Sequence, residues 1–401
     1  MTEHPALPPL APLPYHLAIV AALRADEPEV WAWAASARAR GEYAEQVRAD
    51  LLKESYRLDA DAHAEVHRCA AAAAARLGLD VPVTLYQRGE GAMNAALYFL
   101  PGEAHVVFTG AILERLRGAE LEAVLGHELA HYLLWQLDDG AYHAADRILA
   151  AAAQDPRADA SQLQTARLYR LYTEVFADRG GAVACGALLP AVCALVKTQT
   201  GMGEVSGAHY LKQADEICAP ANLCSGGVSH PEIFIRARAL RLWCEADAAA
   251  EDWLVAAMQG PLALDQLDWL GQERLSALTR RIIMHLLHAP YLRSPALLAH
   301  ARRFFPDIQP AARPDARLAA DLRGAPGVHA YAAYLLADFA AADRDLGDVA
   351  LAAALELALA LGLSDTFEPI ALKELALTKR QLGKIKMAAP LLLVQAGKQD
   401  D

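Results

Sequence analysis

The sequence predicts a mainly α-helical protein with one small antiparallel β-sheet. Alanine-rich runs raise the hydrophobic fraction to 55%, whereas aromatic residues make up only 7%, and this composition favours helices over an all-β fold. Apolar residues recur at helical spacing through most of the chain. Between residues 81 and 109 short runs rich in Val, Thr, Tyr and Phe, separated by glycine-containing turns, indicate strands instead.

The N-terminal part, residues 1–58, is a proline-rich lead followed by two expected helices. A helix is expected next over residues 59–79, because its apolar residues share one face and it ends at Gly78, a residue typical of helix ends. Three strands follow and form the small sheet, at residues 81–86, 95–100 and 105–109.

Helical spacing returns at Ala111, and Gly118 divides this region into two helices. The second of these helices is expected to run from Ala119 to Leu137. Further helices are expected at residues 141–153, 158–184 and 231–248, with a glycine-rich loop region at residues 201–227.

The chain of 401 residues is long enough for two or three domains. We place a boundary near residue 250, which gives a central domain of residues 59–249 and an all-helical block of residues 250–401. Prolines interrupt this block, and it has no fixed repeat period that would indicate a solenoid.

Charge and terminal sequence limit the classes of function. The 37 Lys plus Arg against 49 Asp plus Glu give a formal net charge of −12, which does not support a nucleic-acid-binding surface. No uncharged apolar stretch reaches the roughly 20 residues that span a bilayer, and no Lys or Arg precedes Arg24 as a signal peptide would require. We therefore expect a cytoplasmic protein without a membrane span, and free thiols at its six dispersed cysteines.

Two weaker motifs in the C-terminal block do not indicate a metal site. The aspartates from Asp343 onward suggest a calcium loop, but position 12 is Ala354, where an EF-hand needs glutamate. We interpret this segment as a solvated loop at the start of a helix. His285 and His288 could share a helix face, but no carboxylate lies near them in sequence, so we expect a structural role.

The chemistry is concentrated in the motif H-E-x-x-H at His127, Glu128 and His131. On a helix, residues i and i+4 lie one above the other, so both imidazoles can bind one metal ion, and Glu128 stands beside the open coordination position. This geometry suits zinc and a polarised water molecule.

A catalytic zinc needs a third protein ligand, and the spacing excludes two common solutions. The metzincin pattern requires Gly and His three and six residues after His131, where this chain has Leu134 and Leu137. The thermolysin-like pattern requires Glu 19 or 20 residues after it, where this chain has Ala150 and Ala151.

Three candidates for the third ligand remain. His143 and Asp146 are near in sequence, while Glu174 lies farther on, in an expected helix that carries Asp178 one turn later. We favour Glu174.

With these residues the chain resembles the HtpX-like and CAAX-prenyl-protease-like zinc metallopeptidases, a branch of the gluzincins. In that family a helix with the motif E-x-x-A-D follows H-E-x-x-H, and Glu174, Ala177 and Asp178 occupy those positions here. The resemblance implies one zinc ion per chain, with Glu174 as the third ligand and Asp178 supporting a ligand histidine.

The resemblance covers about residues 60–245. Asn94 and Ala95, together with residues 106–110, are similar to the family's strand pair, whose edge binds an extended peptide or protein substrate. His230 and Pro231, with Arg236 five residues later, match the family's H-P-x-x-x-x-R segment. This implies that His230 faces the metal site and that Arg236 supports the ligands.

The resemblance implies a zinc-dependent endopeptidase in which Glu128 is the general base. His230 either donates a hydrogen bond to the developing oxyanion or occupies the open zinc position in a resting state. Members with transmembrane helices differ from this chain, which looks like a soluble relative. One alternative is an inactive, zinc-stabilised scaffold that binds a partner protein through the C-terminal block, although the intact Glu128 argues against it. Another is a chaperone or sensor gated by the loop at residues 201–227.

Overall fold

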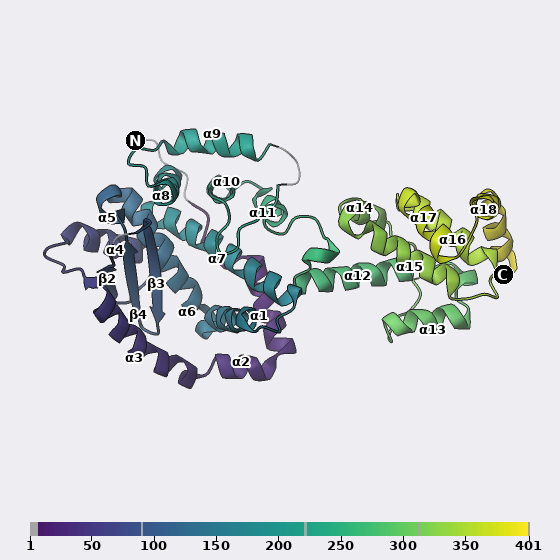
Figure 1. Ribbon diagram of the computed structural model, residues 1–401, viewed down its shortest axis with the longest axis horizontal. Coiled ribbons are helices and arrows are strands. Elements are labelled where there is room, and N and C mark those ends of the chain that lie inside the picture. Colours follow the sequence, from purple (N-terminus) through teal and green to yellow (C-terminus); the bar gives the residue numbers. More distant parts are fainter. Residues whose placement is uncertain (1–6, 90, 220–222, 312, 400–401) are drawn as a thin grey trace. The chain divides into compact units, whose positions relative to one another are not determined.

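The computed structural model describes residues 7–89, 91–219, 223–311 and 313–399 (Figure 1). These residues form many helices and one four-stranded sheet, so the expectation of a mainly helical protein with a small sheet is confirmed. The chain divides into two compact units, Met1–Gly260 and Pro261–Asp401, which we describe separately. Within the described ranges, no helix combines the length and the apolar character needed to cross a membrane.

Three helices, where we expected two, open the first unit: α1 (Pro14–Asp26), α2 (Pro28–Ala34) and α3 (Ala37–Glu54). Pro28 explains the additional helix, because proline suits the first turn of a helix but cannot continue a preceding one. Helix α1 packs against α6 and α7.

His16 of α1 is fully buried in this packing. Its Nδ1 accepts a hydrogen bond from the backbone N–H of Leu13 at 3.2 Å. Its Nε2 therefore carries the proton and donates to the hydroxyl of Thr173 on α7, also at 3.2 Å. The Thr173 hydroxyl in turn donates to the carbonyl oxygen of Tyr169. The imidazole is therefore held in its neutral form.

The sheet has the strand order β1-β2-β4-β3, and its strands are β1 (Tyr56–Arg57), β2 (Val83–Gln87), β3 (Asn94–Leu100) and β4 (Glu103–Thr109). The expectation of a purely antiparallel sheet is wrong in one pairing, because β2 and β4 are parallel. Strand β3 turns back along β4 through Gly102, which has a φ of +84°. Strand β4 thus lies beside β2, and β3 is an edge strand, with no further strand paired to it in the described part of the chain.

Helices cover both faces of the sheet (Figure 1). One face packs on α4 (Ala64–Arg76) and α6 around buried residues such as Val106 and Phe108. The other face packs against α3 through Val47 and Leu51. After the sheet, the short α5 (Ile112–Arg115) leads into α6.

Helices α6 (Gly118–Gln154) and α7 (Ala160–Cys185) form the centre of the unit and cross very closely. A Cβ atom on Gly126 would lie 2.1 Å from the Cβ of Ala184, and one on Gly180 would lie 2.2 Å from the Cβ of Ala130. Small residues are therefore required at the crossing.

Helix α6 is broken at Leu137, followed by three residues with left-handed backbone, Asp138, Asp139 and Gly140. The expected end of a helix at Leu137 and the start of another at residue 141 agree with this break. The first half carries the H-E-x-x-H motif, and the second half lies beside the first part of α7, where the hydroxyl of Tyr169 donates to the carbonyl of Tyr142.

The first unit is completed by α8 (Leu188–Thr200), α9 (Gly207–Ile217), α10 (Ile233–Cys244) and α11 (Ala250–Gln259). Helix α9 lies within the segment that we expected to be a loop. Ser206 caps its first turn, and Leu211 and Ala214 bury one side of it, so an amphipathic helix forms despite the flanking glycines. Residues 220–222 of that segment lie outside the described residues.

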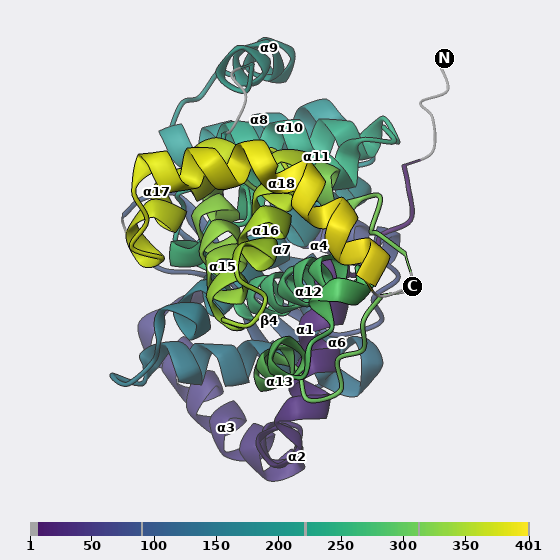
Figure 2. The same cartoon turned by 90° about the vertical axis from the view of Figure 1, so that its right-hand side faces the viewer.

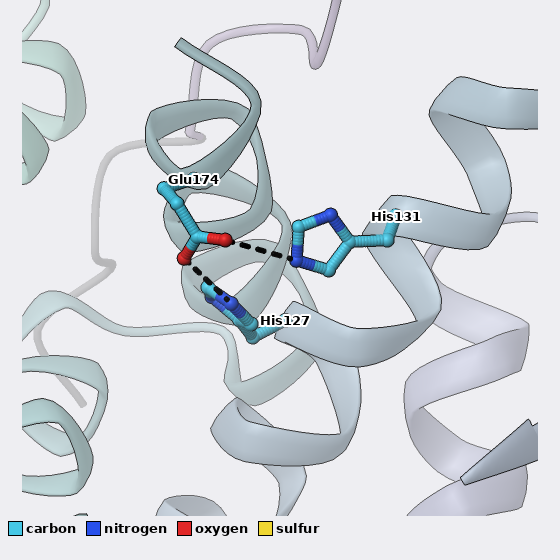
Figure 3. A group of neighbouring side chains, drawn as sticks. All are labelled: His127, His131 and Glu174. Carbon is cyan, nitrogen blue, oxygen red and sulfur yellow. Dashed lines mark ion pairs between the residues drawn. The ribbon is translucent and has the colours of Figure 1, made fainter. Parts of the chain in front are cut away.

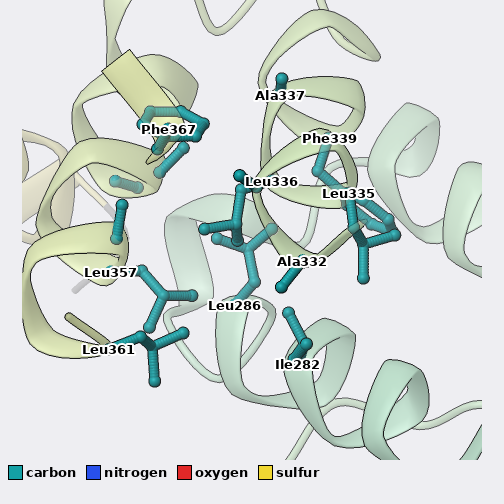
Figure 4. Close-up of a cluster of buried hydrophobic side chains, with 14 of the residues drawn as sticks. Ile282, Leu286, Ala332, Leu335, Leu336, Ala337, Phe339, Leu357, Leu361 and Phe367 are labelled. Atoms are coloured by element: carbon teal, nitrogen blue, oxygen red, sulfur yellow. The ribbon is translucent and has the colours of Figure 1, made fainter. Parts of the chain in front are cut away.

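The second unit is all helical, with its longer helices packed around one apolar core (Figure 4). Helix α15 contacts α16 and α17, and α16 lies against α18 (Figures 1 and 2). The helices of this unit are α12 (Trp269–Leu286), α13 (Pro295–Phe304), α14 (Leu318–Arg323), α15 (His329–Ala341), α16 (Asp348–Ala360), α17 (Ser364–Glu374) and α18 (Lys379–Gln399).

The polar residues singled out in the C-terminal block have structural partners. Nδ1 of His285 accepts a hydrogen bond from the backbone N–H of Asp315, and Nδ1 of His288 lies 2.9 Å from the carbonyl oxygen of His285. Asp343 precedes α16, as expected, but it is buried rather than solvated, and it accepts a hydrogen bond from Ser294.

Candidate metal centre and active site

Two histidines of α6 and one glutamate of α7 converge at a single point (Figure 3). Nε2 of His127 lies 3.4 Å from Oε2 of Glu174, and Nε2 of His131 lies 3.7 Å from Oε1 of the same carboxylate. Each residue offers one ligand atom, and all three atoms lie within 4.8 Å of one another. Two imidazoles and one carboxylate are a donor set that suits zinc.

The His127 ring is held from behind by an acid and a guanidinium. Its Nδ1 lies 3.1 Å from Oδ1 of Asp178. Arg236 of α10 donates two hydrogen bonds to the same carboxylate, from Nε to Oδ2 at 2.8 Å and from Nη2 to Oδ1 at 2.6 Å. This bidentate pair fixes the Asp178 carboxylate, and the carboxylate fixes the orientation of the His127 ring.

The charges at this point favour a bound cation. Burial lowers the pKa of His127, but the hydrogen bond with Asp178 and the nearby carboxylate of Glu174 outweigh burial and raise the pKa to about 10. Burial lowers the pKa of His131 to about 4, so that ring is neutral and its nitrogen can bind a metal. Oε2 of Glu174 is buried and accepts no hydrogen bond among the described residues. A metal ion would satisfy that oxygen and replace the proton on His127.

Glu128 is placed between the metal ligands and the edge strand. Its carboxyl group is buried and interacts with the backbone of Leu97 on β3. Burial raises the pKa of Glu128 to about 7, against the lowering effect of His127 and Leu97. A carboxyl group with this pKa can both accept and return a proton near neutral pH.

His230 lies on a loop that other residues hold against α7. Its Nε2 lies 3.4 Å from Oε2 of Glu174, although the side chain is 56% exposed. Arg167 of α7 donates to the carbonyl oxygens of Gly227 and Ser225, and the backbone N–H of Gly226 donates to Glu232. The loop thus brings His230 to the same oxygen of Glu174 that His127 faces.

These residues line a cavity of about 870 Å³. The unpaired edge of β3 borders it, with Asn94 and Ala95 at its start, and α8 contributes apolar side chains such as Leu195. An extended peptide could add to the free edge of β3 while its backbone passes the metal ligands.

The two candidates for the third ligand that are nearer in sequence, His143 and Asp146, do not belong to the group of convergent ligand atoms. The ring of His143 packs against Phe99 and Trp135, with centroids 4.6 and 5.6 Å away. Asp146 lines the cavity, but it does not belong to the group of convergent ligand atoms.

Two features of the site were not anticipated. The close crossing of α6 and α7 depends on Gly126, Gly180 and Gly181, and the pair of glycines within a helix that also carries a candidate ligand could have indicated it. Arg170, one turn before Glu174 on α7, also lines the cavity. Its spacing of four residues from Glu174 could have indicated this, because residues i and i+4 lie on the same face of a helix.

Comparison with known protein families gave a match over the segment that carries this site. Residues 57–244 match the model of peptidase family M48. The match confirms the resemblance inferred from the motifs, and it contains every residue of the site described above, from Asn94 to Arg236. Helix α11 and the second unit lie outside the M48 match. Comparisons with curated proteins and with solved structures gave no match.

Proposed function

We propose that this protein is a zinc-dependent endopeptidase with one zinc ion per chain. The observation that carries the proposal is the convergence of His127, His131 and Glu174 beside Glu128, in a cavity bordered by a free strand edge. The match to peptidase family M48 supports peptide-bond hydrolysis as the reaction.

His127, His131 and Glu174 would hold the zinc ion, which when bound lowers the pKa of water toward 7 and polarises a carbonyl group. Residues of the protein align the substrate and transfer the proton. The edge of β3 aligns the substrate backbone, with Asn94 and Ala95 at the start of that edge. The Glu128 carboxylate accepts the proton of the attacking water on one oxygen and passes it to the leaving amine.

His230 has a supporting role in this proposal. From its position beside Glu174, its imidazole can donate a hydrogen bond to the oxygen that develops negative charge on the scissile carbonyl. The same position would also let it approach the metal ligands and cover the site between turnovers. Asp178 and Arg236 touch no substrate in this scheme, since their function is to orient His127.

The deciding experiment combines a zinc measurement with cleavage of a peptide library by the wild type and by Glu128→Gln. Glutamine keeps the size of the side chain but cannot accept the proton, so we expect unchanged zinc content and hydrolysis slower by about 10²-fold or more. An unchanged rate in the variant would overturn the mechanism. A wild type that binds zinc yet cleaves no peptide would favour the alternative of a zinc-stabilised scaffold, with the C-terminal helices binding a partner protein.

A further inference from the structure

Arg170 lies in the wall of the proposed active-site cavity. It lies on α7 one turn before Glu174, and Asp178 lies one turn after, so the three side chains share one face of the helix. All three line the cavity. Arg170 thus belongs to the same wall as the metal ligand.

The guanidinium group of Arg170 is free to bind a ligand. Throughout the described ranges it makes no hydrogen bond and no close ion pair, although the residue is partly buried. The other arginine of the cavity wall, Arg236, is already occupied by its two hydrogen bonds to Asp178. A guanidinium has five N–H donors in a planar fork that matches a carboxylate. Arg170 therefore offers an unused site for an anion.

The polar residues near Arg170 form no hydrogen bonds with its guanidinium group. Asp146 shares the cavity wall and feels the charge of Arg170, yet the two groups form no close ion pair. Thr173, one turn after Tyr169, is engaged in its hydrogen bonds with His16 and the Tyr169 carbonyl. The carboxylate of Asp146 partly balances the charge of Arg170 but leaves its N–H donors without a hydrogen-bond acceptor among the described residues.

We propose that Arg170 binds a carboxylate of the peptide substrate, so that cleavage is favoured near an acidic residue or near a C-terminus. The inference rests on the proposed peptidase function and names its substrate class. One helical turn is about 5.4 Å and a strand advances about 3.3 Å per residue, so the carboxylate belongs within about three residues of the scissile bond. Arg170 is a specificity residue, because it binds the substrate without taking part in proton transfer.

The test compares two short degenerate peptide libraries that differ in one fixed central position, which holds Glu in one and Gln in the other. We expect the wild type to cleave the Glu library with a kcat/KM higher by about 10- to 100-fold, the range of a charge-assisted hydrogen bond. Arg170→Ala should abolish this ratio, and Arg170→Glu should reverse it in favour of a matching Lys library. Asp146→Asn removes the competing negative charge and should increase the ratio.

Each library is used as the free acid and as the C-terminal amide. A preference that follows the side chain identifies an acidic residue as the ligand, and one lost on amidation identifies the C-terminus. Zinc content and thermal unfolding of Arg170→Ala should equal those of the wild type, because among the described residues the side chain makes no hydrogen bond or ion pair with a proposed metal ligand. An Arg170→Ala variant that keeps the wild-type Glu-to-Gln ratio would overturn the proposal.

Binding separates this inference from the proposed function. Fluorescent Glu and Gln peptides are titrated onto Glu128→Gln and onto the double variant that also carries Arg170→Ala. If the wild type cleaves nothing, the peptidase function fails, but tighter binding of the Glu peptide that disappears with Arg170→Ala would still support the carboxylate site. Equal binding of both peptides to Glu128→Gln would refute it.

Discussion

At the scale of single residues, the candidate site is a chain of contacts that starts away from the metal ligands. Arg236 holds Asp178, Asp178 holds His127, and Glu174 approaches both ligand histidines from the next helix. Each group limits the orientations of the next one, so the ligand atoms are held close together. Such preorganisation lowers the entropy that metal binding must overcome.

We predict that Glu174→Ala will lower zinc affinity far more than His143→Ala or Asp146→Ala. Only the first change removes one of the convergent ligand atoms, and the other two residues pack or line the cavity. Zinc content per chain after dialysis against a weak chelator measures the difference. A metal-free His143→Ala alongside a zinc-loaded Glu174→Ala would contradict the ligand assignment.

The ligand residues could be predicted from the sequence to different degrees. His127 and His131 followed from the helical period alone, because residues i and i+4 share a face. Glu174 was favoured among three candidates, and the family resemblance then implied it as the third ligand, because no local rule relates it to a helix that begins more than 50 residues earlier. That the guanidinium of Arg170 forms no close ion pair among the described residues could not be predicted from the sequence, because tertiary packing decides which distant side chains pair.

A second prediction concerns pH and the buried His16. Burial, followed by the positive charge of Arg179, lowers its folded-state pKa from 6.5 to about 3. Between these two values the unfolded chain binds the additional proton, so stability falls as pH decreases from 6.5 toward 3. We expect His16 to contribute a loss of about 2 kcal/mol in the free energy of unfolding between pH 7 and pH 5.

The matched variant is His16→Gln, which does not titrate and can still accept the hydrogen bond from the backbone N–H of Leu13. Urea unfolding at both pH values should show a smaller loss in this variant than in the wild type. Equal losses would show that other groups carry the pH dependence.

At the scale of elements, the position of the ligands depends on how closely α6 and α7 cross. An alanine in place of glycine inside a helix usually stabilises by up to about 1 kcal/mol. At Gly126, however, the new Cβ would lie 2.1 Å from the Cβ of Ala184, and neither atom is at the end of a flexible side chain. The two helices must therefore move apart. The cost of this clash exceeds the gain in helix propensity, so the net effect of Gly126→Ala on stability is unfavourable.

We predict that Gly126→Ala destabilises the fold by about 1 to 3 kcal/mol, the usual cost of overpacking, and weakens zinc binding because Glu174 moves away from α6. Gly383→Ala is the control, since a Cβ there has no atom within 4 Å and the helix should gain stability. Thermal unfolding and zinc titration of both variants measure the outcome. A Gly126→Ala variant with wild-type stability would contradict the close crossing.

Other elements show where local patterns are insufficient. Strands β2, β3 and β4 were anticipated from their composition, whereas the two-residue β1 was not. The parallel pairing of β2 with β4 depends on contacts between segments far apart in the chain, which composition does not specify. Helix α9 was missed because its flanking glycines indicated a loop, whereas burial of Leu211 and Ala214 stabilises the helix. In both cases tertiary contacts outweigh local propensity.

At the scale of the whole molecule, the sequence placed a boundary near residue 250, at the start of α11. That helix packs on α7 and α10, Leu254 and Met258 are buried, and Glu251 pairs with Arg179 at 2.7 Å. The physical reason for including α11 in the first unit is this buried surface, which the sequence around residue 250 does not reveal.

We predict that a chain ending at Gly260 folds and binds zinc, whereas one ending at residue 249 unfolds at a lower temperature. Each buried Leu or Met contributes about 1.5 to 3 kcal/mol, so loss of α11 should lower the midpoint by at least about 5 °C. Calorimetry and zinc content of the two truncated chains are the measurements. Aggregation of both chains would show that the first unit requires the second.

The contact between His16 and Thr173 also has a consequence for biosynthesis. The two residues are 157 positions apart, and at 5 to 20 residues per second a ribosome needs on the order of ten to thirty seconds to add that length. During this interval α1 has emerged but its binding surface has not been made, and its apolar residues remain available to chaperones. Helix α1 is therefore synthesised well before α7, and it can reach its final position only after α7 has been made.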